Sequence, residues 1–97
     1  MSLTGKQKRH LRSLGNGLKV SAVIGRGGIN TNNVSEINDA FIDFELLKVK
    51  LIKNEEVDRK ELAQAVAKKT GAELIQVMGQ SILLYKANKE NPYIKLP

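Results

Sequence analysis

The sequence predicts an α/β fold with the element order α-β-α-β-α-β-β and with helices packed mainly on one face of a sheet. Two observations lead to this prediction. Three segments carry apolar residues at the spacing of an amphipathic helix. A fourth segment, residues 46–52, alternates, so that Leu47, Val49 and Leu51 point to one face and Lys48 and Lys50 to the other. A strand with one polar face belongs to a sheet that helices cover on one side.

The size and composition are those of one small globular domain, residues 1–97, of which 41% are hydrophobic. Cysteine is absent, which excludes disulfides and thiolate ligands and fits a reducing compartment. No apolar run approaches the roughly 20 residues that a membrane span needs. We therefore expect a cytoplasmic protein that does not act in a membrane.

The first helix is expected to begin at Thr4, a good N-cap residue, and to reach Leu14, where a glycine-rich turn follows. Its less polar stripe consists of Leu3, Gln7, Leu11 and Leu14. Basic side chains occupy the opposite arc or its margin: Lys6, Lys8, Arg9 and Arg12. The segment therefore predicts a basic amphipathic helix that leucines anchor to the core.

A β-rich run from Lys19 to Ile24 and the loop Gly25-Arg26-Gly27-Gly28 precede a second helix. Asn30 or Thr31 can cap this helix, which we expect to extend to about residue 44. Its core-facing stripe is spaced at i, i+3, i+7 and i+10 and consists of Val34, Ile37, Phe41 and Phe44.

The third helix begins at Asp58, which we expect to form a capping box with Glu61, and ends at Gly71. Its apolar face consists of Leu62, Ala63, Val66 and Ala67. Two strands follow at residues 73–78 and 81–86, joined by Gly79-Gln80 in a type II′ turn. We expect the stripes of all three helices and one face of residues 46–52 to share a single core.

The net charge of +6 is concentrated near the N-terminus. Residues 1–28 contain no Asp or Glu, and their basic residues are Lys6, Lys8, Arg9, Arg12, Lys19 and Arg26. An ordinary surface interleaves the two signs, so this block favours a face that binds nucleic acid. The alternative is a protein-interaction domain whose basic face docks an acidic partner. The chain has only four aromatic residues and no Trp, which argues against a binder built on base-stacking platforms.

The loop Gly25-Arg26-Gly27-Gly28 is the main chemical feature of the sequence. Glycines let the backbone approach a phosphate closely, the following helix presents free N–H groups, and Arg26 adds a charge. A Walker A loop is excluded because its Gly-Lys-Ser/Thr ending is missing, and a dinucleotide fingerprint fails at Asn30. A loop that grips a sugar-phosphate backbone through a G-x-x-G motif is allowed. A turn that needs glycine only for steric reasons is the other interpretation.

Several segments, in this order and spacing, closely resemble the YhbY family of single CRM-domain proteins. They are KQKRHLR at 6–12, LK at 18–19, VIGRGGI at 23–29, ELLKVK at 45–50, TGA at 70–72, QVMG at 76–79 and LLYK at 83–86. The resemblance covers almost the whole chain, and the collinearity of the segments makes it specific.

The resemblance implies a four-stranded mixed sheet with helices, similar to the C-terminal domain of translation initiation factor 3. It also implies RNA binding through the G-x-x-G loop, association with precursors of the large ribosomal subunit, and a role in ribosome assembly. The RNA-binding candidates are Gly25, Arg26, Gly27, Gly28, Lys6, Lys8, Arg9, Arg12, Lys19, Lys48 and Lys50. This chain has Val20 where the family often has Pro, and Ile29-Asn30 where it usually has Leu-Thr.

The remaining polar residues do not assemble a catalytic or metal site. His10 is the only histidine, which excludes a histidine-pair zinc site. It borders the leucine stripe of the first helix, so a packing or surface role is favoured over a catalytic one. Glu55 and Glu56 near Asp58 are compatible with a metal site or an acid–base pair, but a loop position and helix capping explain them more simply. Lys48 and Lys50 either face solvent or contact RNA. We expect a monomeric non-enzyme with no metal, cofactor or small-molecule substrate.

Overall fold

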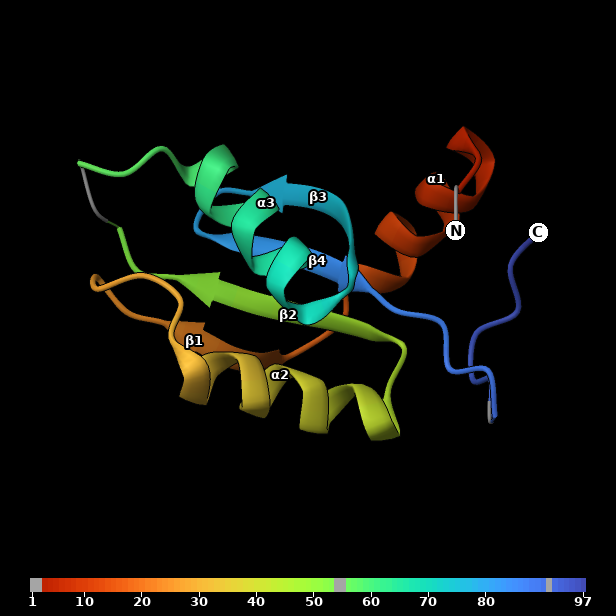
Figure 1. Ribbon diagram of the computed structural model, residues 1–97. Coiled ribbons are helices and arrows are strands. Elements are labelled where there is room, and N and C mark those ends of the chain that lie inside the picture. Colours follow the sequence, from red (N-terminus) through yellow and green to blue (C-terminus); the bar gives the residue numbers. More distant parts are fainter. Residues whose placement is uncertain (1–2, 54–55, 91) are drawn as a thin grey trace.

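The computed structural model describes residues 3–53, 56–90 and 92–97 (Figure 1). Its elements follow the predicted order and are α1 (Gly5–Gly15), β1 (Val20–Ile24), α2 (Thr31–Asp43), β2 (Leu46–Leu51), α3 (Arg59–Thr70), β3 (Glu73–Met78) and β4 (Ser81–Tyr85). The strands form one four-stranded mixed sheet, as the family resemblance implied, and their order in it is β1-β2-β4-β3. β1 and β2 are parallel, while β4 runs antiparallel to both of its neighbours.

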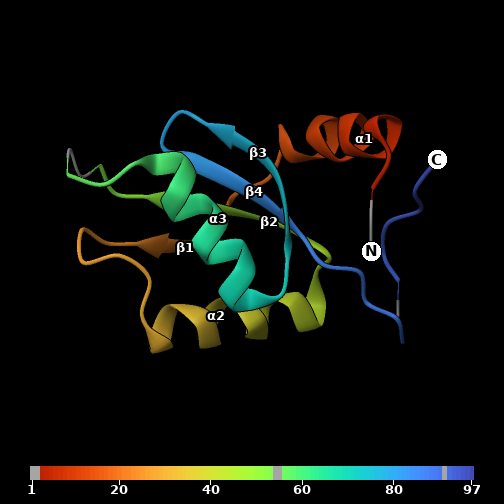
Figure 2. The ribbon, with the colours of Figure 1, turned by 45° about the horizontal axis from the view of Figure 1, so that its top comes forward.

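Two of the three helices lie on one face of the sheet, which confirms the predicted one-sided arrangement for α2 and α3 (Figure 2). Ile37 and Phe41 of α2 and Val66 of α3 are buried there. They pack against the strand residues Ala22, Ile24, Leu47, Val49, Leu51, Ile82 and Leu84. The stripe that was expected to face the core therefore does so at Ile37 and Phe41.

The first helix packs on the opposite face, so the expectation of a single shared core is wrong. Leu11 of α1 joins a second cluster with Leu46, Leu83, Tyr85 and Ile75. The cause is the strand β4, in which Ile82 to Tyr85 are all buried. Alternate side chains of a strand point to opposite faces, so a continuous apolar run needs cover on both sides.

Two residues assigned to core stripes are exposed instead. The side chain of Phe44 is 60% exposed because the helix ends at Asp43 and the Phe44 backbone is extended, so helical spacing no longer applies. Leu14 is 41% exposed. α1 meets the sheet through Leu11 and Gly15, where a Cβ on Gly15 would lie 2.7 Å from a methyl carbon of Leu83. This close approach leaves Leu14 at the side of the contact.

The helix ends form largely as the sequence predicted, except that Asp58 caps α3 without the expected reciprocal bond from the Glu61 side chain. Thr4 caps α1 and Asn30 caps α2, each in a reciprocal capping box with the residue three positions on. Asp58 caps α3 by accepting the N–H groups of Lys60 at 2.8 Å and Glu61 at 3.5 Å. Gly71 ends α3 with a φ of 71°, the left-handed conformation that favours glycine. Gly79 has a φ of 57°, as the first central residue of a type II′ turn requires.

Candidate nucleic-acid interface

The loop Gly25–Gly28 is a tight turn between β1 and α2. The Gly28 N–H donates to the Gly25 carbonyl at 3.0 Å, which closes the four-residue turn. Arg26 and Gly27 are exposed at its tip. Gly28 has a φ of 83°, and it is the only glycine of the loop with a positive φ. Gly28 therefore has a conformational reason to be glycine in the folded chain.

Gly25 and Gly27 have no such internal reason. A Cβ built on either residue meets no heavy atom within 4 Å, and neither residue has a positive φ. Alanine at these positions would therefore fit the folded chain without a clash. The tip of the loop is an open stretch of backbone that another molecule can approach closely.

The start of α2 is fixed directly behind the loop. The Asn30 side chain accepts the Asn33 N–H at 2.8 Å, and the Asn33 side chain accepts the Asn30 N–H at 3.1 Å. The Asn33 side-chain amide also donates to the carbonyl of Val23 at 3.4 Å, which ties the helix to the end of β1. Asn30 therefore serves as an effective cap in the place where the family usually has Thr.

The basic helix α1 and the glycine loop lie at opposite ends of the sheet (Figures 1 and 2). The acid-free block is therefore two separate basic regions. On α1, Lys6 and Arg9 are exposed, whereas Lys8 and Arg12 are half-buried. Lys19, between α1 and β1, is also exposed.

A strip of open sheet connects these two regions. Lys48 and Lys50 follow Leu46 on the face that α1 covers, and they extend from the covered end of β2 towards the loop end. Lys50 is exposed and lies beside Val23 of β1, which is 47% exposed. Lys48 is half-buried. The predicted basic residues thus lie in three parts, namely α1 with the following Lys19, the open sheet face of Lys48 and Lys50, and the loop, and we refer to the three together as the basic face.

The other residues considered as catalytic or metal-binding candidates are not brought together in a site. His10 is half-buried on α1, Glu56 and Asp58 are exposed, and Glu55 lies outside the described residues. Among the described residues, no group of three or more His, Asp or Glu side chains is placed to hold a metal ion. Within the same part of the chain, no helix is long and apolar enough to cross a membrane.

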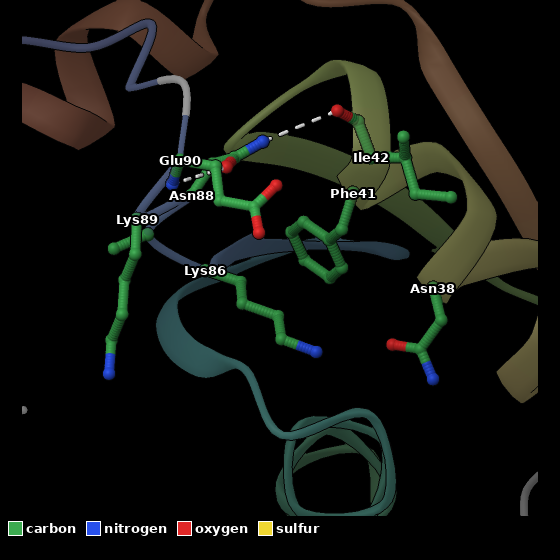
Figure 3. Close-up of a pocket in the computed structure, with 8 residues that line it drawn as sticks. Asn38, Phe41, Ile42, Lys86, Asn88, Lys89 and Glu90 are labelled. Atoms are coloured by element: carbon green, nitrogen blue, oxygen red, sulfur yellow. Dashed lines mark hydrogen bonds between the residues drawn. The ribbon is translucent and has the colours of Figure 1, made fainter.

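A pocket of about 310 Å³ lies between α2 and the segment after β4 (Figure 3). One of its two lysines, Lys86, donates to the carbonyl of Thr70 at 3.1 Å, and the Lys86 ammonium lies 5.9 Å from the centroid of the Phe41 ring. Asn88 donates to the Ile42 carbonyl at 3.4 Å. These contacts join the end of α3 to α2, so Lys86 has a structural role away from the basic face.

The sequence reasoning missed Glu45, which is 2% exposed. Its carboxylate accepts backbone N–H groups from Asn88 at 2.7 Å, Tyr93 at 2.5 Å and Ile94 at 2.7 Å. A charged residue directly before an apolar strand was the only signal of this role. Burial, and then the nearby charge of Glu45, raises the pKa of Tyr85 above its ordinary value.

A family model for the CRS1 / YhbY (CRM) domain matches residues 3–86. The chain belongs to this family. The match confirms the resemblance in the sequence segments and covers all seven elements of the fold.

Three similar proteins span nearly the whole chain. "Probable RNA-binding protein YqeI" of Bacillus subtilis is 43% identical over 95 residues, which cover 98% of this chain and 99% of that protein. "Probable RNA-binding protein PA4753" of Pseudomonas aeruginosa is 33% identical over 88 residues, covering 91% and 85%. The solution structure of SAV1595 from Staphylococcus aureus superposes with a TM-score of 0.85 at 46% identity, covering 99% of this chain and all of that one. This CRM-domain fold is therefore shared with an experimentally determined structure.

Proposed function

We propose that this CRM-family chain is an RNA-binding protein that associates with precursors of the large ribosomal subunit and assists their assembly. The exposed glycine loop carries the proposal. Gly25 and Gly27 leave open space beside the backbone at its tip, so a phosphate of the RNA can approach the chain closely there. The RNA-binding names of two relatives support the same partner. The chain acts as one domain and as a monomer in the cytoplasm, and it needs no cofactor.

The three parts of the basic face have different tasks in this proposal. The loop lets a phosphate approach the backbone near Gly27, with the charge of Arg26 beside it. The start of α2 adds the partial positive charge of a helix N-terminus. The open sheet face and α1 then hold the continuing RNA strand by its phosphates, through lysine and arginine side chains that do not read sequence.

The substitution Gly27→Ala tests the loop more cleanly than Gly28→Ala. Gly28 has a positive φ, so alanine there strains the fold whatever its effect on RNA. Gly27→Ala should keep the melting temperature of the parent and weaken binding to precursor ribosomal RNA in a filter-retention assay. Gly17→Ala is the matched control, because Gly17 is also exposed and a Cβ there meets nothing within 4 Å.

Removal of the Arg26 charge should weaken RNA binding less than Gly27→Ala does. Arg26→Ala should lose about 1–2 kcal/mol of binding free energy, or about fivefold to thirtyfold in affinity, as expected for one charge-assisted contact. If Gly27→Ala and Arg26→Ala both fold and both bind as the parent does, the loop is only a turn. Equal retention of an acidic protein, with no effect of Gly27→Ala, would instead support the interaction-domain alternative, because charge attraction does not need a bare backbone.

A further inference from the structure

An exposed aromatic groove lies at the end of the sheet near α1. Phe44 is 60% exposed and Tyr93 is 53% exposed, and these are two of the four aromatic residues of the chain. Both line one open groove of about 350 Å³, together with Leu14, Leu18, Leu46 and Ile94. Single exposed apolar residues are common, but a shared groove of this kind points to a binding site.

The groove is held in shape by Glu45, the residue that follows Phe44. The buried carboxylate of Glu45 accepts the backbone N–H groups of Tyr93 and Ile94 at 2.5 and 2.7 Å. The two aromatic residues come from distant parts of the sequence, so this contact brings their backbones together. A groove that is fixed in advance loses less conformational entropy when it binds a ligand.

The surroundings of the groove indicate what it binds. Leu14 belongs to the basic helix α1, and the exposed Lys19 directly follows Leu18, so a polyanion on the proposed RNA face passes beside the groove. The lining itself is apolar and aromatic, apart from Glu45, which is already bonded, and Asp43. A phosphate would be repelled by Asp43, whereas a planar neutral base would stack on the aromatic side chains.

We propose that this groove binds one unpaired guanine base of the RNA, a proposal that rests on the proposed RNA-binding function. Asp43 is exposed, and within the described part of the chain its carboxylate takes part in no hydrogen bond or ion pair. A carboxylate accepts two hydrogen bonds side by side. Guanine is the one standard base whose Watson–Crick edge offers two neighbouring donors, N1–H and the N2 amine. Phe44 and Tyr93 provide a stacking surface for this one base, which needs far fewer aromatic residues than a platform that stacks several bases, and Asp43 selects the base.

The test compares hairpin RNAs that differ at one unpaired loop position, which carries guanine, inosine or adenine. Inosine lacks the N2 amine, so it keeps the stacking and loses one hydrogen bond to Asp43. The parent protein should bind the guanine hairpin most tightly and the adenine hairpin most weakly. Asp43→Ala removes both acceptor oxygens, so it should remove the differences in affinity among the three hairpins.

Phe44→Ala and Ile42→Ala form a matched pair of variants. Ile42 is 66% exposed and lies two positions before Phe44, but it does not line the groove. Phe44→Ala should weaken binding of the guanine hairpin about tenfold, in keeping with the usual effect of removing one stacking partner. Ile42→Ala should bind as the parent does. The fluorescence of Tyr93 in a Tyr85→Phe protein, which contains no other Tyr and no Trp, should fall when the hairpin binds.

The outcomes separate this proposal from the function on which it rests. If the parent binds RNA and Gly27→Ala weakens it, but Phe44→Ala does not, the groove proposal fails and the RNA-binding function stands. If the parent binds none of the hairpins or precursor RNAs, the proposed function itself fails. If Phe44→Ala changes the sedimentation of the RNA-free protein, the groove is a contact between copies of the chain and the base-binding proposal is wrong.

Discussion

The Oε1 atom of Glu45 accepts a hydrogen bond from the backbone N–H of Ile94 at 2.7 Å, across 49 positions of the chain. The contact fastens the C-terminal segment, which lies beyond the family match at residues 3–86, to the start of β2. Ile94 and Leu96 then pack against the second core beside α1. Gln7 of α1 also donates to the carbonyl of Pro97 at 3.3 Å. One buried carboxylate thus links the tail to the basic helix.

Glu45→Ala should strongly destabilise the protein. It leaves three backbone donors without their acceptor, and hydrogen bonds to a charged group contribute about 1.5–3 kcal/mol each before the tail relaxes. We expect a loss on the order of 3 kcal/mol in urea unfolding, and faster hydrogen exchange of the Tyr93 and Ile94 amides. Glu36→Ala, which removes an exposed acid of α2, is the control and should stay within about 0.5 kcal/mol of the parent. A loss below about 1 kcal/mol for Glu45→Ala would show that the tail is not held in this way.

Truncation of Phe41 should lower the stability of the protein strongly, whereas truncation of Phe44 should hardly change it. Phe41 is 6% exposed in the first core, so Phe41→Ala should cost about 3–5 kcal/mol of unfolding free energy. Phe44 is 60% exposed, so Phe44→Ala should change the same quantity by less than about 0.5 kcal/mol. Reversible thermal melts of the two variants measure the difference. Similar losses for both would mean that α2 is rotated from the position described.

Phe41 and Phe44 also show which features of the fold the sequence patterns predict and which they do not. The spacing of apolar residues, together with capping residues at the helices, predicted all seven elements, because these signals are local in the sequence. The stripe through Phe41 was extended to Phe44, however, and no local signal placed the end of the helix at Asp43. Which face α1 would cover was also not predictable from α1 itself. It depends on the run Ile82–Tyr85, whose apolar residues need cover on both faces of the sheet.

The candidate site was predictable in composition but not in arrangement. The loop Gly25–Gly28 and the basic residues of α1 were identified from charge and glycine content, yet their separation by the length of the sheet is a property of the tertiary fold. Glu45 could not be identified as an anchor, because its three donors lie 43 to 49 positions away. The groove of Phe44 and Tyr93 depends on that same distant contact.

The stability of the protein should fall at alkaline pH through Tyr85. Burial, followed by the Glu45 charge, raises the pKa of Tyr85 above its ordinary value of 10.0. The folded state therefore favours the neutral phenol, and this contribution is complete below the unfolded pKa and is lost as the pH rises through the folded pKa. A Tyr93→Phe protein has Tyr85 as its only tyrosine, so its phenolate absorbance can be followed against pH with and without urea. Equal midpoints in the two conditions would contradict the raised pKa.

The last prediction concerns the basic face as an electrostatic surface. If about four phosphates contact α1, the open sheet face and the loop, the logarithm of the RNA affinity should fall with the logarithm of salt concentration at a slope near −3. Arg9→Glu on α1 and Lys50→Glu on β2 reverse exposed charges at two parts of this face. Each should weaken binding to all RNA sequences alike and make the slope shallower by about 0.7–0.9, because each removes one released counterion.

Lys68→Glu and Lys89→Glu are the matched controls, because both lysines are exposed, Lys68 on α3 and Lys89 in the segment after β4, and neither belongs to the basic face or to the groove. They change the net charge by the same amount as Arg9→Glu and Lys50→Glu, so they separate a local phosphate contact from a general loss of positive charge. Both controls should keep the slope of the parent. If they weaken binding as much as Arg9→Glu and Lys50→Glu do, the RNA is attracted by the whole molecule, and α1 and the open sheet face have no special part in holding it.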